Sequence, residues 1–222
     1  MPPSRGKFIT FEGLDGTGKS TQIARLAKSL RGRGHSILVT REPGGTITGE
    51  KIRYVLLDSA TTGLDPMAEM ALMFASRAQH IAEVIEPALA DGKIVLCDRF
   101  TDSTEAYQGG GRKLGSKPVL TLHRILCRDL QPDLTILLEF DLATSIERAR
   151  RRNRAQSLRN RADEKDENRF ELETRAFFGR VRHAYDAIAR REPRVVVIDA
   201  SGTPSQTHTR VLEVVRKKFR LA

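Results

Sequence analysis

Residues 13–20 read GLDGTGKS and fit the pattern G-x-x-x-x-G-K-[ST]. Glycines in such a loop let backbone N–H groups turn toward phosphate oxygens, because no Cβ stands in the way. The lysine of this pattern reaches β- and γ-phosphates, and the final hydroxyl binds Mg²⁺. The sequence therefore predicts a triphosphate cradle formed by Gly13, Leu14, Asp15, Gly16, Thr17, Gly18, Lys19, Ser20 and Thr21.

The context of this loop favours a phosphate cradle over a glycine-rich turn with a solvated lysine. An apolar, β-branched run precedes the loop, and Ile23, Leu26, Ala27 and Leu30 follow with the spacing of one helix face. A strand–loop–helix order is what the cradle requires, since the helix N-terminus adds its positive dipole end. Kinases, GTPases, helicases and transport ATPases all use such a loop, so the motif leaves these classes open.

A second cluster that can bind phosphate is the run at 148–161, RARRRNRAQSLRNR, which contains seven arginines and no acid. These seven charges leave only +3 of the net charge of +10 for the rest of the chain. Five acidic residues follow directly within 162–171. A surface that coats a nucleic-acid backbone gains nothing from such neighbours. The basicity is local, which predicts contact with a few phosphates and no nucleic-acid partner.

Five short apolar runs supply the elements that must position these residues. Each is rich in β-branched residues and ends in polar residues or glycine, as expected of strands buried on both faces of a parallel sheet. Ligands of such sheets bind beyond the carboxyl ends of the strands. The polar tails should therefore line one crevice. The runs are 7–13, 35–45, 93–100, 132–141 and 194–202.

Helical patterns fill the gaps between these runs. Asp65 is an expected N-cap before Pro66, Pro87 should distort the long helix that follows, and Asp141 should cap a helix over 142–152. Alternating strands and helices predict an α/β fold of the P-loop NTPase type, with a doubly wound, five-stranded parallel sheet and flanking helices. We expect one domain over residues 1–222.

The remaining composition places few further demands on function. There is no apolar run long enough to cross a bilayer and no apolar segment typical of a signal peptide. Cys97 and Cys127 show no CxxC spacing and suit a reduced, cytoplasmic protein. We therefore expect a cytoplasmic protein with no membrane partner.

Five segments in register resemble the bacterial thymidylate kinase family, which belongs to the P-loop nucleoside monophosphate kinases. The resemblance covers essentially the whole chain and implies transfer of the ATP γ-phosphoryl group to dTMP, with Mg²⁺ as cofactor. It also implies a homodimer packed through helices between the second and third strands. The segments are FEGLDGTGKST at 11–21, REPGGT at 41–46, GEKIRYVLLD at 49–58, SRAQH at 76–80 and DRFTDSTEAYQGGGR at 98–112.

The resemblance assigns roles at the dTMP phosphate and sugar. Asp15 would accept a hydrogen bond from the sugar 3′-hydroxyl, and Arg99 would bind the acceptor phosphate, with Arg41 and Arg53 nearby. Asp98 would either complete the Mg²⁺ site with Ser20, through a water molecule, or orient Arg99, and Glu12 and Glu42 are weaker candidates for the metal shell.

The resemblance also assigns roles at the base. Arg77 would bind the thymine edge, and Thr104 and Gln108 would meet the base. Tyr107 would pack beneath the deoxyribose and exclude a 2′-hydroxyl. The family usually places a stacking phenylalanine four residues before the arginine, where this chain has Met73; we therefore expect Phe74 to stack on the base.

The arginine run corresponds to a mobile Arg-rich lid over approximately 148–171. The phosphate loop contains no arginine, so the lid must supply the charge that stabilises phosphoryl transfer. We expect Arg152 and Arg169 to be catalytic together with Lys19 and Arg99, and Arg148 to be structural or to face adenine. Asn168 replaces the aspartate usual before Arg169. The segment SGTPSQTH after the fifth strand is a further candidate for adenine contact.

Two other functions remain open on the sequence. Another nucleoside monophosphate kinase, specific for cytidylate or guanylate, would share the same cradle and lid. A P-loop ATPase or GTPase that binds nucleic acid through the arginine run is a different class. The local charge balance and the segments REPGGT and DRFTDSTEAYQG disfavour that second alternative.

Overall fold

A computed structural model describes residues 5–157 and 169–221. At its centre is one five-stranded sheet, in which every neighbouring pair is parallel and the order is β2–β3–β1–β4–β5. The predicted α/β class and all five predicted strands are confirmed. The strands are β1 (Lys7–Glu12), β2 (Ile37–Arg41), β3 (Ile94–Asp98), β4 (Leu134–Glu139) and β5 (Val195–Asp199).

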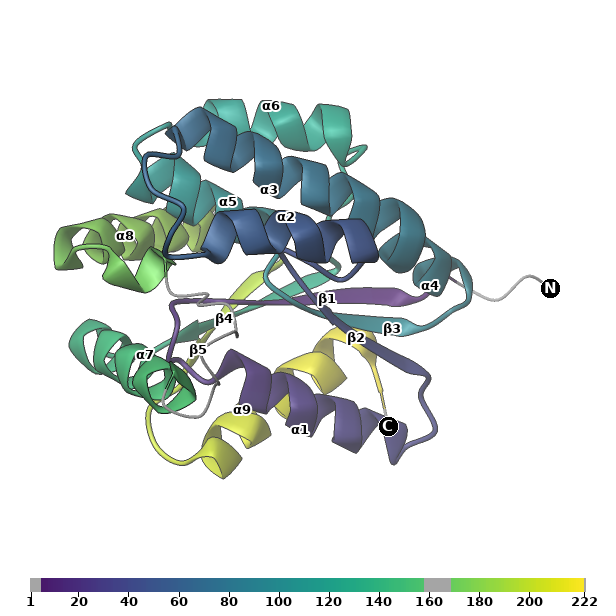
Figure 1. Cartoon of the computed structure of the whole chain (residues 1–222). Coiled ribbons are helices and arrows are strands. Elements are labelled where there is room, and N and C mark those ends of the chain that lie inside the picture. Colours follow the sequence, from purple (N-terminus) through teal and green to yellow (C-terminus); the bar gives the residue numbers. More distant parts are fainter. Residues whose placement is uncertain (1–4, 158–168, 222) are drawn as a thin grey trace.

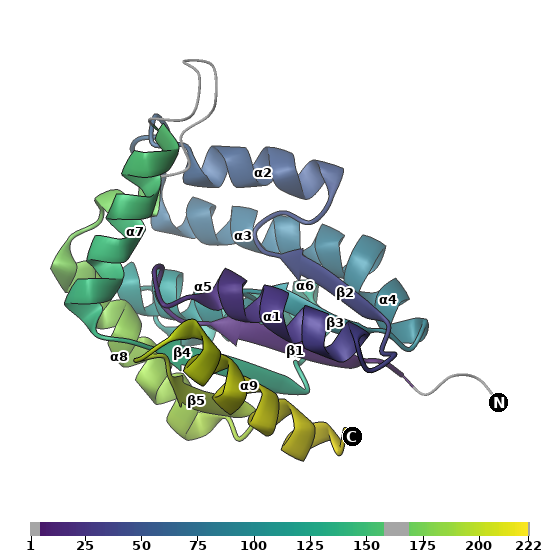
Figure 2. The same ribbon diagram turned by 90° about the horizontal axis from the view of Figure 1, so that it is seen from below.

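Helices cover both faces of the sheet, as the doubly wound arrangement requires (Figures 1 and 2). α1 (Lys19–Arg31) and α9 (Pro204–Phe219) pack on one face, where Leu26 and Val211 share an apolar core. α3 (Pro66–His80) and α6 (Ser116–Leu126) cover the other, and α2 (Ile47–Leu57) packs on α3. Within the described ranges, no helix combines the length and apolar character needed to cross a bilayer.

The predicted start and distortion of the long helix are both present. Asp65 accepts hydrogen bonds from the N–H groups of Met67 and Ala68, and Pro66 is the first residue of α3. A π-helical turn, η1 (Ile81–Ile85), follows α3, and α-helical geometry resumes only in α4 (Glu86–Ala90), which contains Pro87. Proline lacks the N–H that a regular helix would use there, which accounts for the interruption.

A third group of elements packs beside the phosphate loop. It comprises α5 (Thr101–Thr104), the π-helical η2 (Glu105–Gly111), α7 (Leu142–Ser157), the 3₁₀ turn η3 (Arg169–Leu172) and α8 (Arg175–Arg191). The predicted cap is confirmed, since Asp141 accepts from the Thr144 N–H at 2.8 Å. Leu14, Tyr107 and Tyr185 belong to one apolar cluster, which packs η2 and α8 beside the loop.

Strand register brings the polar strand ends to one edge of the sheet. Arg41 pairs with Asp98, and Asp98 pairs with Phe11. On the other side of β1, Glu12 pairs with Leu137. Residues that lie far apart in sequence therefore surround the segment that follows β1.

Candidate active site

The phosphate loop has the backbone that its glycines were expected to permit. Gly13, Gly16 and Gly18 have φ angles of 125°, 86° and 95°, a region that side chains with a Cβ rarely adopt. A Cβ on Gly16 would also lie 2.3 Å from the carbonyl oxygen of Ser145 on α7. The loop is therefore close against the start of α7, and glycine is required there on both counts.

Lys19 is buried within this loop. Its Nζ donates to the carbonyl oxygens of Gly13 at 2.9 Å and Leu14 at 3.0 Å, and lies 3.7 Å from Asp15 Oδ1. Burial lowers the pKa of Lys19, and the positive charge of Arg99 lowers it further. The ammonium thus sits inside the curve of the loop, where a phosphate could take over its contacts from the two carbonyls.

Ser20 and Asp98 together offer the oxygens that Mg²⁺ prefers. Ser20 Oγ donates to Asp98 Oδ2 at 3.0 Å, which joins the start of α1 to the end of β3. The second carboxylate oxygen, Oδ1, is buried and has no hydrogen-bond partner in the described part of the chain. A hydroxyl beside a carboxylate with an unused oxygen fits a hard divalent cation. Thr21 is the residue after Ser20 on α1, and its side chain is exposed.

Asp15 and Arg99 form an ion pair next to the loop. Arg99 Nη2 donates to Asp15 Oδ1 at 2.9 Å, and Nη1 donates to Ser103 Oγ at 3.0 Å. The φ angle of Arg99 is 71°, an unusual conformation for an arginine and one that recurs at functional sites. Burial alone would lower the pKa of Arg99, but Asp15, Tyr107 and Tyr185 raise it well above its usual value. The guanidinium is held as a fixed cation.

Glu12 supports this turn from behind. It is fully buried and accepts hydrogen bonds from the Phe100 N–H at 2.7 Å and the Tyr185 hydroxyl at 2.9 Å. Burial, followed by repulsion from Asp102, raises the pKa of Glu12 to about 7, although Arg99 opposes the shift. Both of its oxygens accept from protein donors, so Glu12 suits the cation shell less well than Asp98.

Glu42 is not placed with the phosphate loop but holds Arg77. Arg77 Nε donates to Glu42 Oε2 at 2.7 Å, and His80 Nδ1 lies 2.9 Å from Glu42 Oε1. Burial would raise the pKa of Glu42, but Arg77 and His80 lower it below its usual value. The buried pair keeps Glu42 ionised as a partner for the arginine.

Arg77 combines a fixed position with an unused donor. It is 2% exposed, donates through Nη2 to Thr104 Oγ1 at 2.9 Å, and lies over the rings of Phe74 and Phe100. Its Nη1 is buried without a hydrogen-bond partner among the described residues. Buried donors are rarely left unpaired, so this one marks a place where a ligand acceptor can bind.

The structure separates Met73 from Phe74. Phe74 is fully buried in the core under α3, with Arg77 against its ring. Met73 is partly buried and packs instead on the cluster that contains Tyr107 and Leu14. Met73 also lies four residues before Arg77, on the same stripe of the helix. Stacking by Phe74 on the base stays a prediction. Because Phe74 is fully buried in the core, the partly buried Met73 is better placed to contact the base.

Tyr107 and Gln108 lie on η2 opposite α3. The Tyr107 hydroxyl accepts from Arg99 Nη2 at 3.3 Å, and its ring packs edge-on against Phe170. Gln108 is 1% exposed and donates to Glu69 Oε1 at 2.8 Å. Tyr107 therefore contacts Arg99, whereas Gln108 contacts α3 through Glu69.

Arg41 and Arg53 lie beside the turn after β2. Arg41 is exposed and pairs with Glu50 at 3.0 Å, while Arg53 Nη1 donates to the Pro43 carbonyl at 3.0 Å. Glu50 also accepts from the Gly45 N–H at 2.9 Å. These contacts tie α2 to the turn and leave Arg41 at the end of β2, beside Asp98 of β3.

The predicted catalytic arginines of the lid are placed differently from one another. Arg148 is exposed and stacks over Phe140 at 4.1 Å, which agrees with a structural role. Arg152 lies on α7, but its side chain is outside the described residues, as are residues 158–168 including Asn168. Arg169 Nη2 donates to Glu69 Oε2 at 2.6 Å, and Nε to the Leu56 carbonyl at 2.6 Å. Arg169 thus contacts α2 and α3 and not the phosphate loop.

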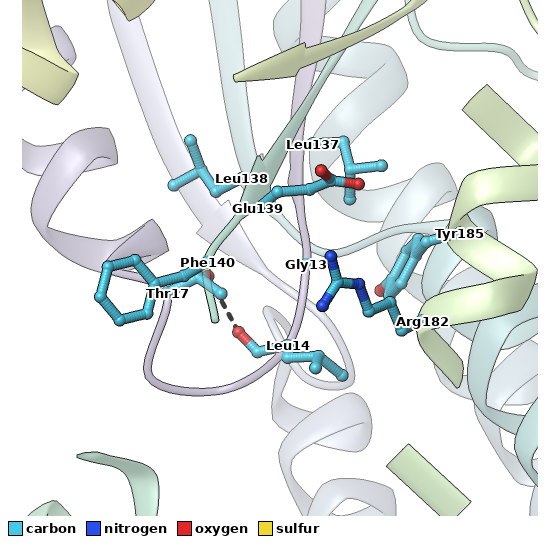
Figure 3. A pocket seen from close by; sticks show the side chains of 9 residues that line it. All are labelled: Gly13, Leu14, Thr17, Leu137, Leu138, Glu139, Phe140, Arg182 and Tyr185. Carbon is cyan, nitrogen blue, oxygen red and sulfur yellow. Dashed lines mark hydrogen bonds between the residues drawn. The ribbon is translucent and has the colours of Figure 1, made fainter. Parts of the chain in front are cut away.

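A pocket lies behind the phosphate loop, between the ends of β1 and β4 and the helix α8 (Figure 3). Arg182 extends from α8 toward Gly13 and Leu14. Sequence reasoning missed Arg182 and Tyr185, because no motif surrounds them. The only signal was the amphipathic pattern of 175–191, which indicates a helix but not its partner. The lining residues are Gly13, Leu14, Thr17, Leu137, Leu138, Glu139, Phe140, Arg182 and Tyr185.

Comparisons with known proteins identify the family of the chain. The thymidylate kinase family model matches residues 11–211. The chain is 50% identical to a thymidylate kinase of Trichlorobacter lovleyi, over 96% of this chain and 98% of that protein. It is 47% identical to one from Cereibacter sphaeroides, over 93% of each. The crystal structure of thymidylate kinase from Ehrlichia chaffeensis superposes with a TM-score of 0.73 at 30% identity, covering 95% of this chain and 99% of that one. The chain belongs to the thymidylate kinase family.

Proposed function

We propose that the protein transfers the γ-phosphoryl group of ATP to the 5′-phosphate of dTMP, which yields dTDP and ADP for dTTP biosynthesis. The observation that carries the proposal is the buried Arg77 guanidinium with its unpaired Nη1 among the described residues, at the same sheet edge as the phosphate loop. Thymine O4 accepts hydrogen bonds and suits this donor, and Thr104 already accepts from the same guanidinium.

The two nucleotides would lie end to end across the Asp15–Arg99 pair. Loop N–H groups and Lys19 would bind the ATP phosphates, while Arg99 would bind the acceptor phosphate with help from Arg41 and Arg53. Asp15 orients Arg99 through the 2.9 Å contact and would also accept from the sugar 3′-hydroxyl. Both reactants would then be fixed before reaction, which removes much of the entropic cost.

The chemical step needs no general base. An oxygen of the dTMP phosphate is already a nucleophile near neutral pH; it attacks the γ-phosphorus, and the bond to the β–γ bridging oxygen breaks with its electron pair leaving on ADP. Lys19 and Arg99 would stabilise the charge on the transferred group and on the acceptor. Mg²⁺, held by Ser20 and Asp98, would neutralise charge on the β- and γ-phosphate oxygens.

The arginine-rich segment would close over this junction as a lid. α7 abuts Gly16 of the loop, so the arginines that follow on α7 would begin close to phosphates bound by the loop. We retain Arg152 as the catalytic lid residue. Arg169 is better proposed as a residue that fixes the base of the lid, because Glu69 and the Leu56 carbonyl hold it.

A homodimer in the cytoplasm is part of the proposal. Large apolar side chains are exposed on the helices that cover β2 and β3, which supports packing of two copies through this face. Free, buried Cys97 and Cys127 are compatible with a reducing compartment. Light scattering after size-exclusion chromatography would measure the molar mass, and the mass of a monomer would refute the proposed dimer. The exposed apolar residues are Ile47, Val55, Met67, Ile125 and Leu126.

A panel assay tests the function. Purified protein, ATP and Mg²⁺ would be combined with dTMP, dUMP, dCMP, dGMP and the corresponding ribonucleotides, and ADP release would be measured. We expect dTMP to be the best acceptor by a wide margin. Equal ATP consumption with and without dTMP would refute the proposal. Salt-sensitive binding of DNA with the same ATP consumption would instead favour the nucleic-acid alternative.

A further inference from the structure

Two side-chain contacts link α3 to α5 and η2 beside the proposed thymine site. Arg77 donates to Thr104 at 2.9 Å, and eight residues earlier on α3, Glu69 accepts from Gln108 at 2.8 Å. Glu69, Met73 and Arg77 are spaced by four residues and so share one stripe of the helix. Glu69 therefore closes the end of the site opposite to Arg77.

Glu69 is a fully buried carboxylate in contact with two guanidinium groups. Arg112 donates to both of its oxygens at 3.1 and 3.2 Å, and Arg169 donates to Oε2 at 2.6 Å. Arg112 and Arg169 in turn lie over the ring of Phe170. The carboxylate is thus fixed in place from three sides and offers only acceptors.

This contact sets the direction of the Gln108 amide. A carboxylate cannot donate, so Gln108 must turn its NH₂ group toward Glu69, at 2.8 Å. Its carbonyl oxygen then points elsewhere and has no hydrogen-bond partner in the ranges that the structure describes. Within those ranges the site consequently presents an unused donor on Arg77 and an unused acceptor on Gln108.

We propose that Glu69 is a positioning residue for base specificity, which fixes the Gln108 amide so that its carbonyl oxygen accepts from thymine N3–H. This proposal rests on the proposed function. Thymine offers an acceptor at O4 and a donor at N3, which matches Arg77 and Gln108. Cytosine has a donor amino group and an acceptor N3 at these places, so it meets two mismatches. With a neutral partner in place of Glu69, the amide could turn over and accept the cytosine pattern.

The test compares dTMP with dCMP in the Glu69→Gln variant. We expect the preference for dTMP, measured as the ratio of the two kcat/KM values, to fall by about tenfold or more, because one hydrogen-bond mismatch is relieved. The KM for dTMP should rise more than kcat falls. If turnover of dCMP is too slow to measure, its inhibition constant against dTMP replaces kcat/KM.

Glu105→Gln is the matched control. Glu105 lies on the same segment η2, is 3% exposed and forms two hydrogen bonds of 2.8 Å with Arg191 on α8. Its loss breaks an ion pair between a buried carboxylate and a half-exposed arginine on the other side of the segment. The control should lose stability but keep the wild-type preference for dTMP.

A double variant distinguishes orientation from general damage. In Glu69→Gln combined with Gln108→Glu, the carboxylate introduced on η2 again offers only acceptors to the base, while the amide introduced on α3 can donate to it. Most of the lost preference for dTMP should return. If Glu69→Gln fails to fold by circular dichroism, Glu69→Asp serves instead, because it keeps the charge and withdraws the carboxylate from Gln108.

The outcomes separate this proposal from the proposed function. A wild-type protein that does not phosphorylate dTMP contradicts the function itself. A wild-type protein active on dTMP, with an unchanged ratio in the Glu69 variant or an equal fall in the Glu105 control, shows that Glu69 is merely structural.

Discussion

The phosphate end and the base end of the site are built in different ways. The phosphate loop uses eight consecutive residues, and its contacts come largely from backbone groups and from Lys19. The base end uses side chains from separate elements, such as Arg77, Thr104 and Glu42, joined by hydrogen bonds in the interior. At the first end function depends on local backbone shape, and at the second it depends on the tertiary core.

Lys19→Ala tests whether the phosphate end can lose function without losing the fold. The substitution removes the positive charge that would stabilise the reacting phosphates, and turnover should fall by about 10²–10³-fold. Stability should change little, by about 1 kcal/mol, because the losses are hydrogen bonds to two loop carbonyls and a long, partly exposed ion pair with Asp15. Initial rates and urea unfolding would be measured on the same preparation, with Lys28→Ala on the exposed part of α1 as control. A wild-type rate in Lys19→Ala would contradict the assignment of the loop.

Arg77→Met tests the opposite expectation at the base end. It leaves Glu42 buried beside His80 without its arginine, which should destabilise the protein by about 3–5 kcal/mol. The KM for dTMP should rise by about 10²-fold, since a buried charged donor to the base is lost. Thermal unfolding and dTMP titration would measure both effects. If the affinity for dTMP falls with no change in stability, function at the base end does not depend on the tertiary core.

The same contrast explains what sequence reasoning could predict. The loop and the five strands follow from contiguous patterns, and the cap at Asp65 follows from a residue type next to a proline. Their physical causes act within a few residues, so the chain itself reveals them. The metal site proposed at Ser20 and Asp98 required the resemblance to a family, because 78 residues separate the two partners.

The base end was predicted as a set of residues but not as a network. Glu42 was considered for the metal shell, whereas it pairs with Arg77 and His80. Phe74 was chosen for stacking because of its residue type, and the structure buries it because helix rotation directs it to the core. Glu69 drew no attention, since only the fold brings it to Gln108 and Arg169. Long-range pairing of buried polar groups has no local signature.

Glu12→Gln tests the charge that supports Arg99. The pKa of Glu12 is raised to about 7 from an ordinary value of 4.5. Between these two pH values the folded protein therefore keeps a proton on Glu12 that the unfolded chain has released. Its contribution to stability is present below pH 4.5 and is lost as the pH rises toward 7, on the order of 3 kcal/mol or slightly more. The free energy of unfolding, measured in urea at several pH values, should fall less over this range in Glu12→Gln than in the wild type.

His123 must be separated from this effect because its sign is opposite. Burial lowers its pKa to about 4 from 6.5, so stability is lost as the pH falls through this range. His123→Asn should remove that loss and steepen the apparent decline toward pH 7. If the difference between the wild type and Glu12→Gln stays constant between the two pKa values of Glu12, about 4.5 and 7, the carboxylate is ionised throughout and the expectation is wrong.

Tyr107 belongs to both ends and gives the smallest and most discriminating test. Its hydroxyl accepts from Arg99, while its ring packs with Phe170 and Phe177 in the core. Tyr107→Phe removes only the hydroxyl, so it should weaken phosphate positioning slightly and keep the preference for deoxyribose. Tyr107→Leu replaces the ring proposed to lie beneath the sugar with a smaller side chain, which leaves room for a 2′-hydroxyl. The preference for dTMP over its ribonucleotide should fall by about tenfold. If both variants change the phosphate step alone, the ring does not select the sugar, and Tyr107 acts only through Arg99.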